Sequence, residues 1–330
     1  MIWRGWANSV ISNRMAPDQL QRAMIARGSG ERQRNILARY LDGTLSGEMA
    51  LMYLLQASPD TVDIRSMLDA AIAACPEALA ARERSLLHRL SDLATANQHG
   101  CDRIARMLGS GIDTDQPAAS VEQGIEFCAR LFDWSVDQCA EASVALYSLG
   151  NPAILNAATA EIVKLMRDWR LLGPTRDVLE IGCGIGRFQQ GLAGEAHTVT
   201  GIDVSANMIR VARERCADCG NVDLQHCTGR DLAMFDAGTF DLVFAVDSFP
   251  YIFQSGMDLV ERHFEEVLRV LKPRGDFLIL EFSYHRTLEA DQRDVSRLAA
   301  GAFDVLACGT RPFKLWDGSA FHLRARCARL

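Results

Sequence analysis

Strand-like and helix-like segments alternate through the C-terminal half of this 330-residue chain, and no other feature constrains the fold as much. Apolar, strand-like runs occupy about residues 178–182, 197–203, 222–227, 240–246 and 276–282, and helical periodicity appears between several of them. Regular alternation of this kind predicts a parallel sheet with helices on both faces. Two more strand-like stretches follow residue 303, and Asp317-Gly318 between them is typical of a hairpin turn, so we expect an antiparallel edge.

The first strand runs into a glycine-rich loop, in the sequence DVLEIGCGIGRF at 177–188. Ligands of such sheets bind at the carboxyl ends of the strands, where glycines let the backbone approach closely and adopt positive φ. The helix that follows points free N–H groups toward the same edge. A dinucleotide loop needs G-x-G-x-x-G, but the spacing from Gly182 is G-x-G-x-G, and Arg187 stands where the third dinucleotide glycine would be.

Asp203 ends the second strand, in GIDVS. A carboxylate at this position can accept hydrogen bonds from both hydroxyls of a ribose, which suits NAD and S-adenosylmethionine alike. The alternative is that Asp203 caps the following helix, although Ser205 is also available for that role. The sequence therefore predicts a nucleoside-containing ligand whose ribose contacts Asp203.

Four segments in this order resemble the class I S-adenosylmethionine-dependent methyltransferases: DVLEIGCGIGRF, TVTGIDVSANMI, TGRDLAMFDAGTFDLVFAVDSFPYI and EEVLRVLKPRGDFLILEF. The resemblance covers about residues 150–330. It implies a Rossmann-like α/β fold with a seven-stranded, mostly parallel sheet and an antiparallel last strand. It also implies S-adenosyl-L-methionine as the cofactor and methyl transfer as the activity.

The resemblance assigns cofactor-binding roles to residues of this chain. It places Asp203 at the ribose, and Val204 and Met208 against the adenine. Around the methionine part it places Glu180, Gly182, Gly184 and Gly186, and Cys183 in the same loop is also expected to bind the cofactor. The adenine edge departs from the family, because Cys227-Thr228 stands where many members have Gly-Asp. The adenine amino group is then expected to meet either Asp231 or the backbone around Gly229 and Arg230, and Asp231 has the alternative of capping a turn.

The methyl acceptor is expected near the ends of the fourth and fifth strands. Asp247 is expected to contact the cofactor and the acceptor, and the catalytic candidates are Asp247, Tyr251 and His285, with Tyr284 as a further base. For His285 the alternative is an exposed loop histidine. The sequence also predicts an aromatic wall around the acceptor, formed by Tyr147, Phe249, Tyr251, Phe253 and Trp316. These five residues are equally suited to a core or a lid.

The acceptor class follows mainly from motifs that are missing. The loop VDSFPY is not the Asn/Asp-Pro-Pro-Tyr/Phe of enzymes that methylate amides or exocyclic amines, so a small molecule methylated on oxygen or nitrogen is expected. One alternative is a non-catalytic subunit that binds S-adenosylmethionine or a metabolite. The other is an NAD-dependent oxidoreductase, which the loop spacing and the missing Tyr-x-x-x-Lys disfavour.

Composition limits the partners and the compartment. A formal net charge of −7 without a lysine or arginine block argues against nucleic acid as a partner. No apolar run reaches the length of a membrane span. The ten cysteines are scattered through apolar stretches, as in a cytoplasmic protein with reduced thiols. The expectation is a cytoplasmic protein without membrane or nucleic-acid partners.

One cysteine cluster has metal-ligand spacing: Cys216 and Cys219, followed by His226-Cys227. The two later residues lie in a strand pattern, where neighbouring side chains point to opposite faces. A shared ion is therefore not expected, and the sequence predicts no metal.

The N-terminal part has a different character. Residues 18 to about 108 have helical periodicity without a chemical motif. The predicted domains are a helical accessory domain at 1–110, which serves as a lid or a homodimer surface, a linker at 111–120, and a methyltransferase domain at 121–330. The first twenty residues are either a docked or frayed terminus or a transit segment.

Overall fold

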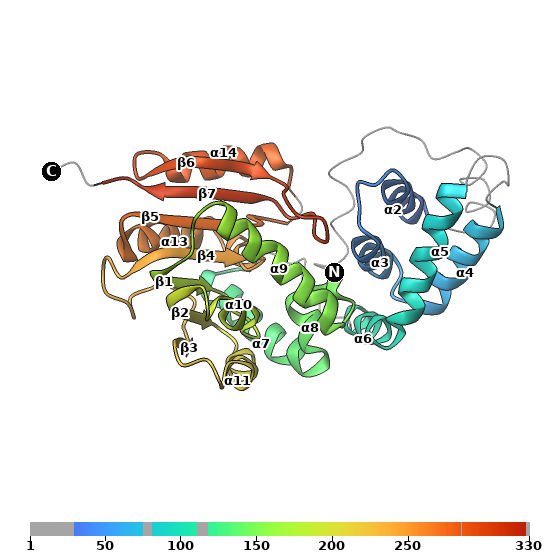
Figure 1. The fold of residues 1–330 in the computed structure, drawn as a ribbon, viewed down its shortest axis with the longest axis horizontal. Coiled ribbons are helices and arrows are strands. Elements are labelled where there is room, and N and C mark those ends of the chain that lie inside the picture. The colour runs from blue at the N-terminus through green and yellow to red at the C-terminus, as the bar shows by residue number, and fades with distance from the viewer. Residues whose placement is uncertain (1–29, 75–80, 111–117, 285, 328–330) are drawn as a thin grey trace. The chain divides into compact units, whose positions relative to one another are not determined.

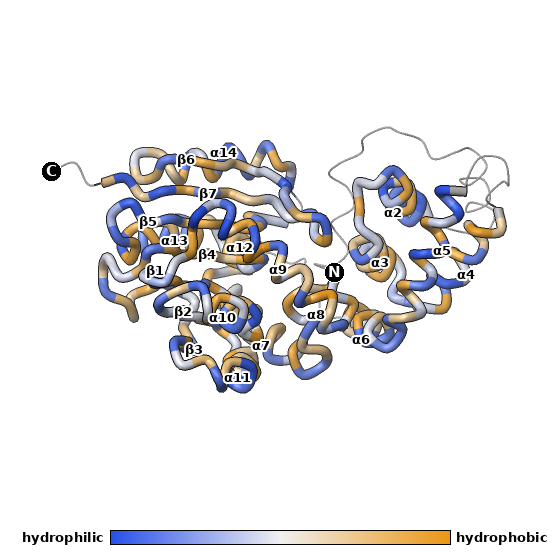
Figure 2. The backbone as a smooth tube through the Cα atoms, viewed as in Figure 1, coloured by the Kyte–Doolittle hydropathy of each residue, from blue (hydrophilic) through white to orange (hydrophobic). Residues whose placement is uncertain are grey.

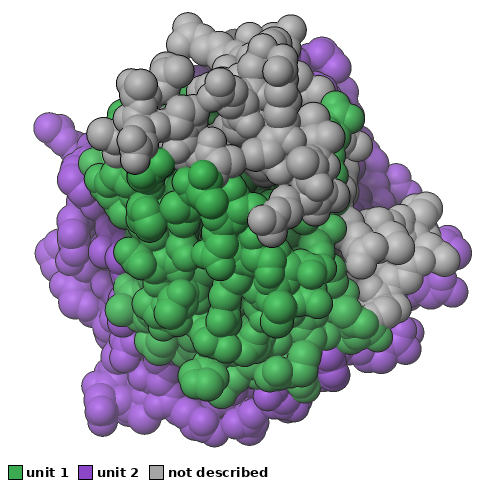
Figure 3. All heavy atoms as spheres, turned by 90° about the vertical axis from the view of Figure 1, so that its right-hand side faces the viewer, with its two compact units in different colours: residues 1–115, 138–155, 314–317 green, residues 116–137, 156–313, 318–330 purple. Residues whose placement is uncertain are grey.

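The computed structural model describes residues 30–74, 81–110, 118–284 and 286–327. These residues form two compact units, which are coloured separately in Figure 3. Unit 1 groups the described residues before 116 with 138–155 and 314–317, and unit 2 contains the rest. The domain boundaries at 110 and 121 stay predictions, and this division assigns two short segments of the predicted methyltransferase domain to unit 1. The first twenty residues and most of the predicted linker lie outside the described residues.

Unit 2 contains a seven-stranded sheet with the order β3-β2-β1-β4-β5-β7-β6 (Figure 1). Strands β1 to β5 pair in parallel, whereas β7 is antiparallel to both β5 and β6, so the predicted fold class is confirmed. The strands are β1 (Gly173–Ile181), β2 (Ala196–Asp203), β3 (Val222–His226), β4 (Phe240–Val246), β5 (Leu271–Leu280), β6 (Phe303–Thr310) and β7 (Ala320–Ala325). The helices are α7 (Val121–Gln138), α9 (Pro152–Asp168), α10 (Arg187–Leu192), α11 (Ala206–Arg215), α12 (Phe249–Gln254), α13 (Met257–Val270) and α14 (Leu288–Ala299), of which α7 and α9 each have one end in unit 1.

Alternate residues of the central strands face opposite layers of helices. Val243 and Ala245 of β4 share a hydrophobic cluster with Phe264 of α13. Phe244, which lies between them, packs edge-on against Phe188 of α10, with ring centroids 5.8 Å apart. Because successive strand residues point to opposite faces, α10 and α13 cover opposite faces of the sheet. The sheet is thus buried on both sides, as its continuous apolar strands require.

Two details differ from the sequence-based expectation. Helical periodicity in the sequence extends over 257–272, but α13 ends at Val270, because Leu271 already pairs with Phe240 of β4 as the first residue of β5. Asp317-Gly318 does not form a tight hairpin turn, since a longer connection joins β6 to β7 and Asp317 groups with unit 1.

Unit 1 is helical and is built around α3, which is hydrophobic on nearly every side (Figure 2). All of the residues from Met49 to Gln56 are buried, as expected for a helix without a polar face. The Tyr53 hydroxyl donates to Asp317 Oδ2 at 2.8 Å, and Trp316 stacks on Tyr147 with centroids 6.2 Å apart. The elements of unit 1 are α2 (Glu31–Leu41), α3 (Gly47–Ala57), α4 (Thr61–Ala74), α5 (Ala81–Ala96), α6 (Gln98–Gly109), α8 (Ala140–Val144) and the 3-10 helix η2 (Leu146–Ser148).

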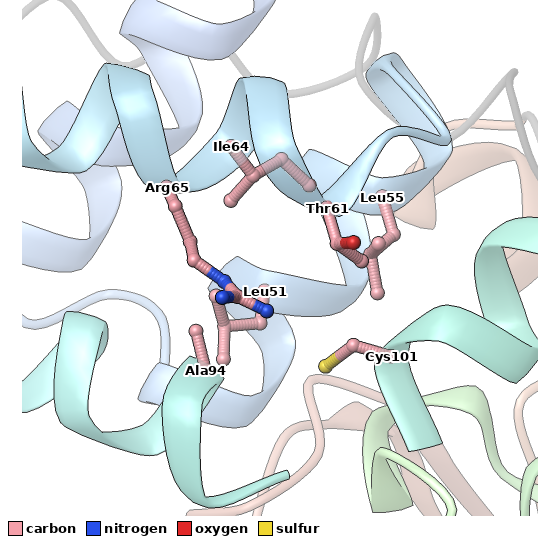
Figure 4. A pocket seen from close by; sticks show the side chains of 7 residues that line it. All are labelled: Leu51, Leu55, Thr61, Ile64, Arg65, Ala94 and Cys101. Carbon is pink, nitrogen blue, oxygen red and sulfur yellow. The ribbon is translucent and has the colours of Figure 1, made fainter. Parts of the chain in front are cut away.

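A small pocket lies among α3, α4, α5 and α6 (Figure 4). Most of its lining is apolar, and it contains no residue of the glycine loop. Its lining residues are Leu51, Leu55, Thr61, Ile64, Arg65, Ala94 and Cys101. Across the described residues, no helix combines the length and the apolar character that a membrane crossing requires.

Candidate cofactor and active site

Positive φ angles shape the loop between β1 and α10. Gly182, Gly184 and Gly186 have φ of 76°, 52° and 73°, a region that residues with side chains rarely adopt. The Ile202 carbonyl accepts hydrogen bonds from Gly182 N at 2.8 Å and from Cys183 N at 2.9 Å, which ties the loop to β2. The Cys183 side chain is buried in a hydrophobic cluster. The loop is therefore a fixed turn of main chain at the carboxyl end of β1.

The Asp203 carboxylate lies beside this loop. Its Oδ2 accepts from Gly184 N at 2.8 Å, and its Oδ1 accepts from Ser205 N at 2.9 Å. Asp203 is 7% exposed, and desolvation raises its pKa to about 6. Ser205 caps α11, because its hydroxyl accepts from the N–H of the fully buried Met208 at 3.0 Å. Within the described parts of the chain, the two bonds leave about two of the roughly four acceptor positions of the Asp203 carboxylate for a ligand.

The segments after β2 and β3 meet at Val204 and Gly229. A Cβ added to Gly229, where φ is 72°, would come within 2.5 Å of Val204 Cγ1. Asp231 Oδ1 accepts from a backbone N–H two residues further on at 3.2 Å, which is the turn-capping role that the sequence left open. Arg230 is exposed, and its guanidinium lies 3.9 Å from the Glu122 carboxylate. Gly229 therefore packs closely against the Val204 side chain.

Glu180 and Arg187 are buried ionisable residues at the two ends of the glycine loop. Glu180 Oε2 accepts from Gln189 Nε2 at 2.8 Å, and desolvation raises the pKa of Glu180 to about 8. The Arg187 guanidinium lies over the Phe188 ring at 4.5 Å and is one of the charges that act on Glu180. Arg187 Nη1 has no hydrogen-bond partner among the described residues, and an unsatisfied buried donor costs free energy. This donor suits an anionic group of a ligand.

Asp247 and Tyr284 join the ends of β4 and β5. The Tyr284 hydroxyl donates to Asp247 Oδ1 at 2.6 Å, and Asp247 has a φ of 56°, which is uncommon for a residue with a side chain. The Tyr251 ring lies edge-on to the Tyr284 ring, with centroids 5.6 Å apart. Desolvation raises the pKa of both tyrosines well above the ordinary value. The structure thus brings a carboxylate and two neutral phenols together.

The other acceptor-site expectations have mixed outcomes. Phe249 lies in the core of unit 2 and has no exposed surface, so it does not line a pocket. Trp316 and Tyr147 stack as buried residues of unit 1, and Phe253 packs beside Phe282. The aromatic candidates are thus divided, with Tyr147 and Trp316 in unit 1 and Phe249 and Phe253 in unit 2. His285 lies outside the described residues.

Sequence reasoning gave α7 no role, yet this helix lies against the carboxyl ends of several strands. A Cβ added to Gly124 would come within 2.5 Å of Ser255 in the segment after α12. The Phe132 ring lies edge-on to Tyr251 at 4.9 Å. Asp133 Oδ1 accepts a hydrogen bond from the Ser205 hydroxyl at 2.6 Å. The sequence of α7 indicates an amphipathic helix, but no motif marks what its buried face covers.

Comparison with known proteins identifies the domain around this site. A family model described as "Methyltransferase domain" matches residues 179–279. The Bacillus subtilis (strain 168) protein YqeM, named as a candidate methyltransferase, is 31% identical over 159 residues, which make up 44% of this chain and 62% of YqeM. A demethylmenaquinone methyltransferase of Tropheryma whipplei (strain Twist) is 32% identical over 123 residues, which make up 37% of this chain and 48% of that protein. The chain thus spans about half the length of these curated relatives.

A solved structure shares the fold. Haemonchus contortus phosphoethanolamine N-methyltransferase 1, determined with phosphoethanolamine and S-adenosylhomocysteine, superposes with a TM-score of 0.52 at 19% identity. The match covers 66% of this chain and 52% of that chain. The family match, the sheet order and the glycine loop beside Asp203 agree with one another. Residues 179–279 are therefore a methyltransferase domain of the class I family, whose cofactor is S-adenosylmethionine.

Proposed function

We propose that this chain transfers a methyl group from S-adenosylmethionine to a small-molecule acceptor, on oxygen or nitrogen. The observation that carries the proposal is the Asp203 carboxylate, which Gly184 N and Ser205 N fix at the end of β2 and which keeps acceptor positions that no other described residue fills. Relatives such as the demethylmenaquinone methyltransferase are named for small-molecule acceptors, which supports the same class here.

Each part of the cofactor has a matching group in unit 2. Asp203 would accept hydrogen bonds from the ribose hydroxyls. The buried Arg187 Nη1, which has no partner in the described part of the chain, would donate to the carboxylate of the amino-acid part. Val204 and Gly229, which contact each other, would hold the adenine, with backbone groups rather than Asp231 at its edge. Glu180 and the three loop glycines would surround the amino-acid part.

Asp247 would lie where the cofactor meets the methyl acceptor. When bound, S-adenosylmethionine supplies a methyl group on a sulfonium, so the protein mainly has to align the reacting atoms. The Tyr284 hydroxyl holds Asp247 in one orientation, in which the Asp247 carboxylate would accept a proton or a hydrogen bond from an acceptor hydroxyl or amine. The ordinary pKa of a tyrosine already lies above pH 7, and burial raises the pKa of Tyr251 and Tyr284 further. Both therefore stay protonated, and we assign them hydrogen-bonding roles rather than roles as bases.

Calorimetry of the full chain with S-adenosylhomocysteine tests the cofactor, with NAD as the control ligand. We expect micromolar binding of the first and none of the second. Asp203→Ala should weaken binding by a few kcal/mol, because a charged acceptor of hydrogen bonds is lost. Wild-type affinity in a folded Asp203→Ala variant would contradict the ribose assignment.

Mass spectrometry then tests the activity. The full chain is incubated with S-adenosylmethionine and panels of small phenols, carboxylic acids and amines, and products are searched for the mass of one added methyl group. Methylation by the wild-type chain that Asp247→Asn abolishes would support the proposal. Tight cofactor binding without any methylated product across the panels would favour the alternative of a non-catalytic binding subunit.

A further inference from the structure

Helix α7 lies against the segments that follow three strands of the sheet, β2, β3 and β4, all within unit 2. After β2 it meets Ser205, to which Asp133 is bonded. After β3 its Ile125 Cγ2 lies 3.2 Å from the position of a Cβ built on Gly229. After β4 its Phe132 packs on Tyr251. Because ligands of this sheet bind at those strand ends, α7 borders the cofactor site.

Asp133 makes the polar contacts between α7 and the start of α11. Its Oδ1 accepts from the Ser205 hydroxyl at 2.6 Å and from Asn207 N at 3.0 Å, and its carbonyl accepts from Asn207 Nδ2 at 3.2 Å. A carboxylate at the first turn of α11 also complements the positive end of the helix dipole. Asp133 thus acts as a second cap of α11, supplied by a helix distant in the sequence.

These contacts continue to the glycine loop. Ser205 is held through its hydroxyl by Asp133, and its own N–H donates to Asp203 Oδ1 at 2.9 Å. The other oxygen of Asp203 accepts from Gly184 N at 2.8 Å. A hydrogen-bonded path therefore runs from α7 through the start of α11 to the loop. Each group in the path is fixed by the next one.

We propose that Asp133 is a positioning residue of the cofactor site, which holds Ser205, and through it the Asp203 carboxylate, in the orientation that binds the ribose. The inference rests on the proposed use of Asp203 for the cofactor. Asp133 need not touch the ligand, and its effect reaches the site through hydrogen bonds and charge.

The charge of Asp133 provides a signature that a purely structural contact lacks. Desolvation is the largest cause of the raised pKa of Asp203, and the negative charge of Asp133 raises it further. The other groups that interact with Asp203 are His226, which lowers its pKa, together with Glu180, Cys128, Cys183 and Cys227. Removing the charge of Asp133 should lower the pKa of Asp203.

The test is calorimetry with S-adenosylhomocysteine from pH 5 to 8 on the full chain. In the wild type, affinity should fall as the pH drops through about 6, because protonated Asp203 loses acceptor capacity. Asp133→Asn keeps an acceptor oxygen, so it should bind nearly as well at pH 8, and its loss of affinity should shift to lower pH. Asp133→Ala should bind at least about tenfold more weakly at pH 8, which corresponds to about 1.4 kcal/mol.

Asp137→Ala is the matched control, because Asp137 is an exposed carboxylate on the same helix that contacts Asn207 and Arg210. It should change affinity less than about twofold, within the range of an exposed ion pair. Equal affinity of Asp133→Ala and Asp137→Ala, or an unmoved pH profile in Asp133→Asn, would overturn the inference. The wild type is measured first, and if it does not bind S-adenosylhomocysteine, the proposed function itself is overturned.

Discussion

Ser248 lies directly over Gly182, and this contact joins the loop after β4 to the glycine loop. The Ser248 hydroxyl donates to the Ile181 carbonyl at 2.6 Å. A Cβ added to Gly182 would come within 2.4 Å of Ser248 Cβ, closer than atoms in real structures approach. The first glycine of the loop is therefore required by packing within the protein, independently of any ligand.

Gly182→Ala should destabilise the fold even without cofactor. The new methyl group collides with Ser248, and overpacking of this kind costs about 1–3 kcal/mol. The φ of 76° adds about 1–2 kcal/mol for a residue with a side chain. We expect a total loss of about 2–5 kcal/mol in the free energy of unfolding, measured by urea denaturation.

Two further variants separate the causes. Gly182→Ala combined with Ser248→Gly should lose less stability than the sum of the single changes, because the collision is gone and the backbone strain remains. Gly194→Ala is the control, since a Cβ there meets no atom within 4 Å. Strict additivity of the double variant would show that Ser248 is not what excludes the methyl group.

A second prediction concerns the pH dependence of stability through Glu180. Burial raises the pKa of Glu180 from 4.5 in the unfolded chain to about 8 in the folded protein. Between these two pH values Glu180 is protonated in the folded state and ionised in the unfolded state. The contribution of Glu180 to stability is thus fully present below pH 4.5 and is lost as the pH rises through about 8. Glu180→Gln should flatten this decline in cofactor-free protein, measured by urea denaturation from pH 5 to 8.

The matched control for this prediction is Glu195→Gln. Glu195 is an acid paired with Arg167, and its pKa is lowered, so its titration lies below this window. Glu195→Gln should leave the decline of the free energy of unfolding between pH 5 and 8 unchanged. A slope in Glu180→Gln equal to that of the wild type would mean that Glu180 is ionised in the folded protein at neutral pH.

The sequence predicts the sheet and the glycine loop because both depend on local patterns. Apolar strands before glycines and the acidic end of β2 are visible without coordinates. The start of α14 is less visible in the sequence. The pattern DVSRLAAGAF predicts a helix over 294–303, but α14 begins at Leu288, where the Thr287 hydroxyl caps it by accepting from Ala290 N. Its first turn is acidic rather than apolar, so hydrophobic periodicity starts too late to mark it.

Residues that act through tertiary contacts had no local signal at all. Asp133 and Phe132 lie in an ordinary amphipathic helix, and only the packing of α7 brings them to Ser205 and Tyr251. The positive φ of Asp247 is equally invisible, because nothing in the sequence marks a left-handed aspartate there. Backbone strain of this kind persists when surrounding contacts fix it, and it often accompanies function.

A third prediction tests the pair formed by Tyr284 and Asp247. Tyr284→Phe removes the hydroxyl that donates to Asp247 at 2.6 Å but keeps the ring. If Asp247 acts on the acceptor, kcat should fall by about tenfold, whereas the dissociation constant of S-adenosylhomocysteine should change by less than about threefold. Asp247→Asn should lower kcat by about 100-fold or more.

The double variant shows whether the two residues act as a unit. Adding Tyr284→Phe to Asp247→Asn should cost little more than Asp247→Asn alone, because the hydroxyl acts through the carboxylate. Independent, multiplicative effects on kcat would contradict this dependence. A parallel loss of cofactor affinity in Asp247→Asn would instead place the residue against the cofactor.

A fourth prediction concerns stability away from the active site, where Lys272 lies between two carboxylates, Asp177 and Asp241, at the point where β1 and β4 begin to pair. Its Nζ lies 2.8 Å from Asp177 Oδ2 and 2.7 Å from Asp241 Oδ2. Desolvation acts to raise the pKa of Asp177, but hydrogen bonds from Lys272 and its other neighbours outweigh it and lower the pKa to about 2. The stabilisation is therefore present above pH 3.8 and is lost as the pH falls through about 2.

Lys272→Met should lower the free energy of unfolding at pH 7 by about 1 kcal/mol, a modest value because the side chain is about one-third exposed and solvent screens the pair. The difference from the wild type should shrink as the pH approaches 2, and kcat should not change, because these strand ends lie opposite the glycine loop. Lys164→Met removes an exposed pair with Asp168 and should have almost no effect. Urea denaturation at pH 7 and pH 3 measures both variants, and equal losses in the two would mean that the bridge between β1 and β4 adds nothing beyond an ordinary surface pair.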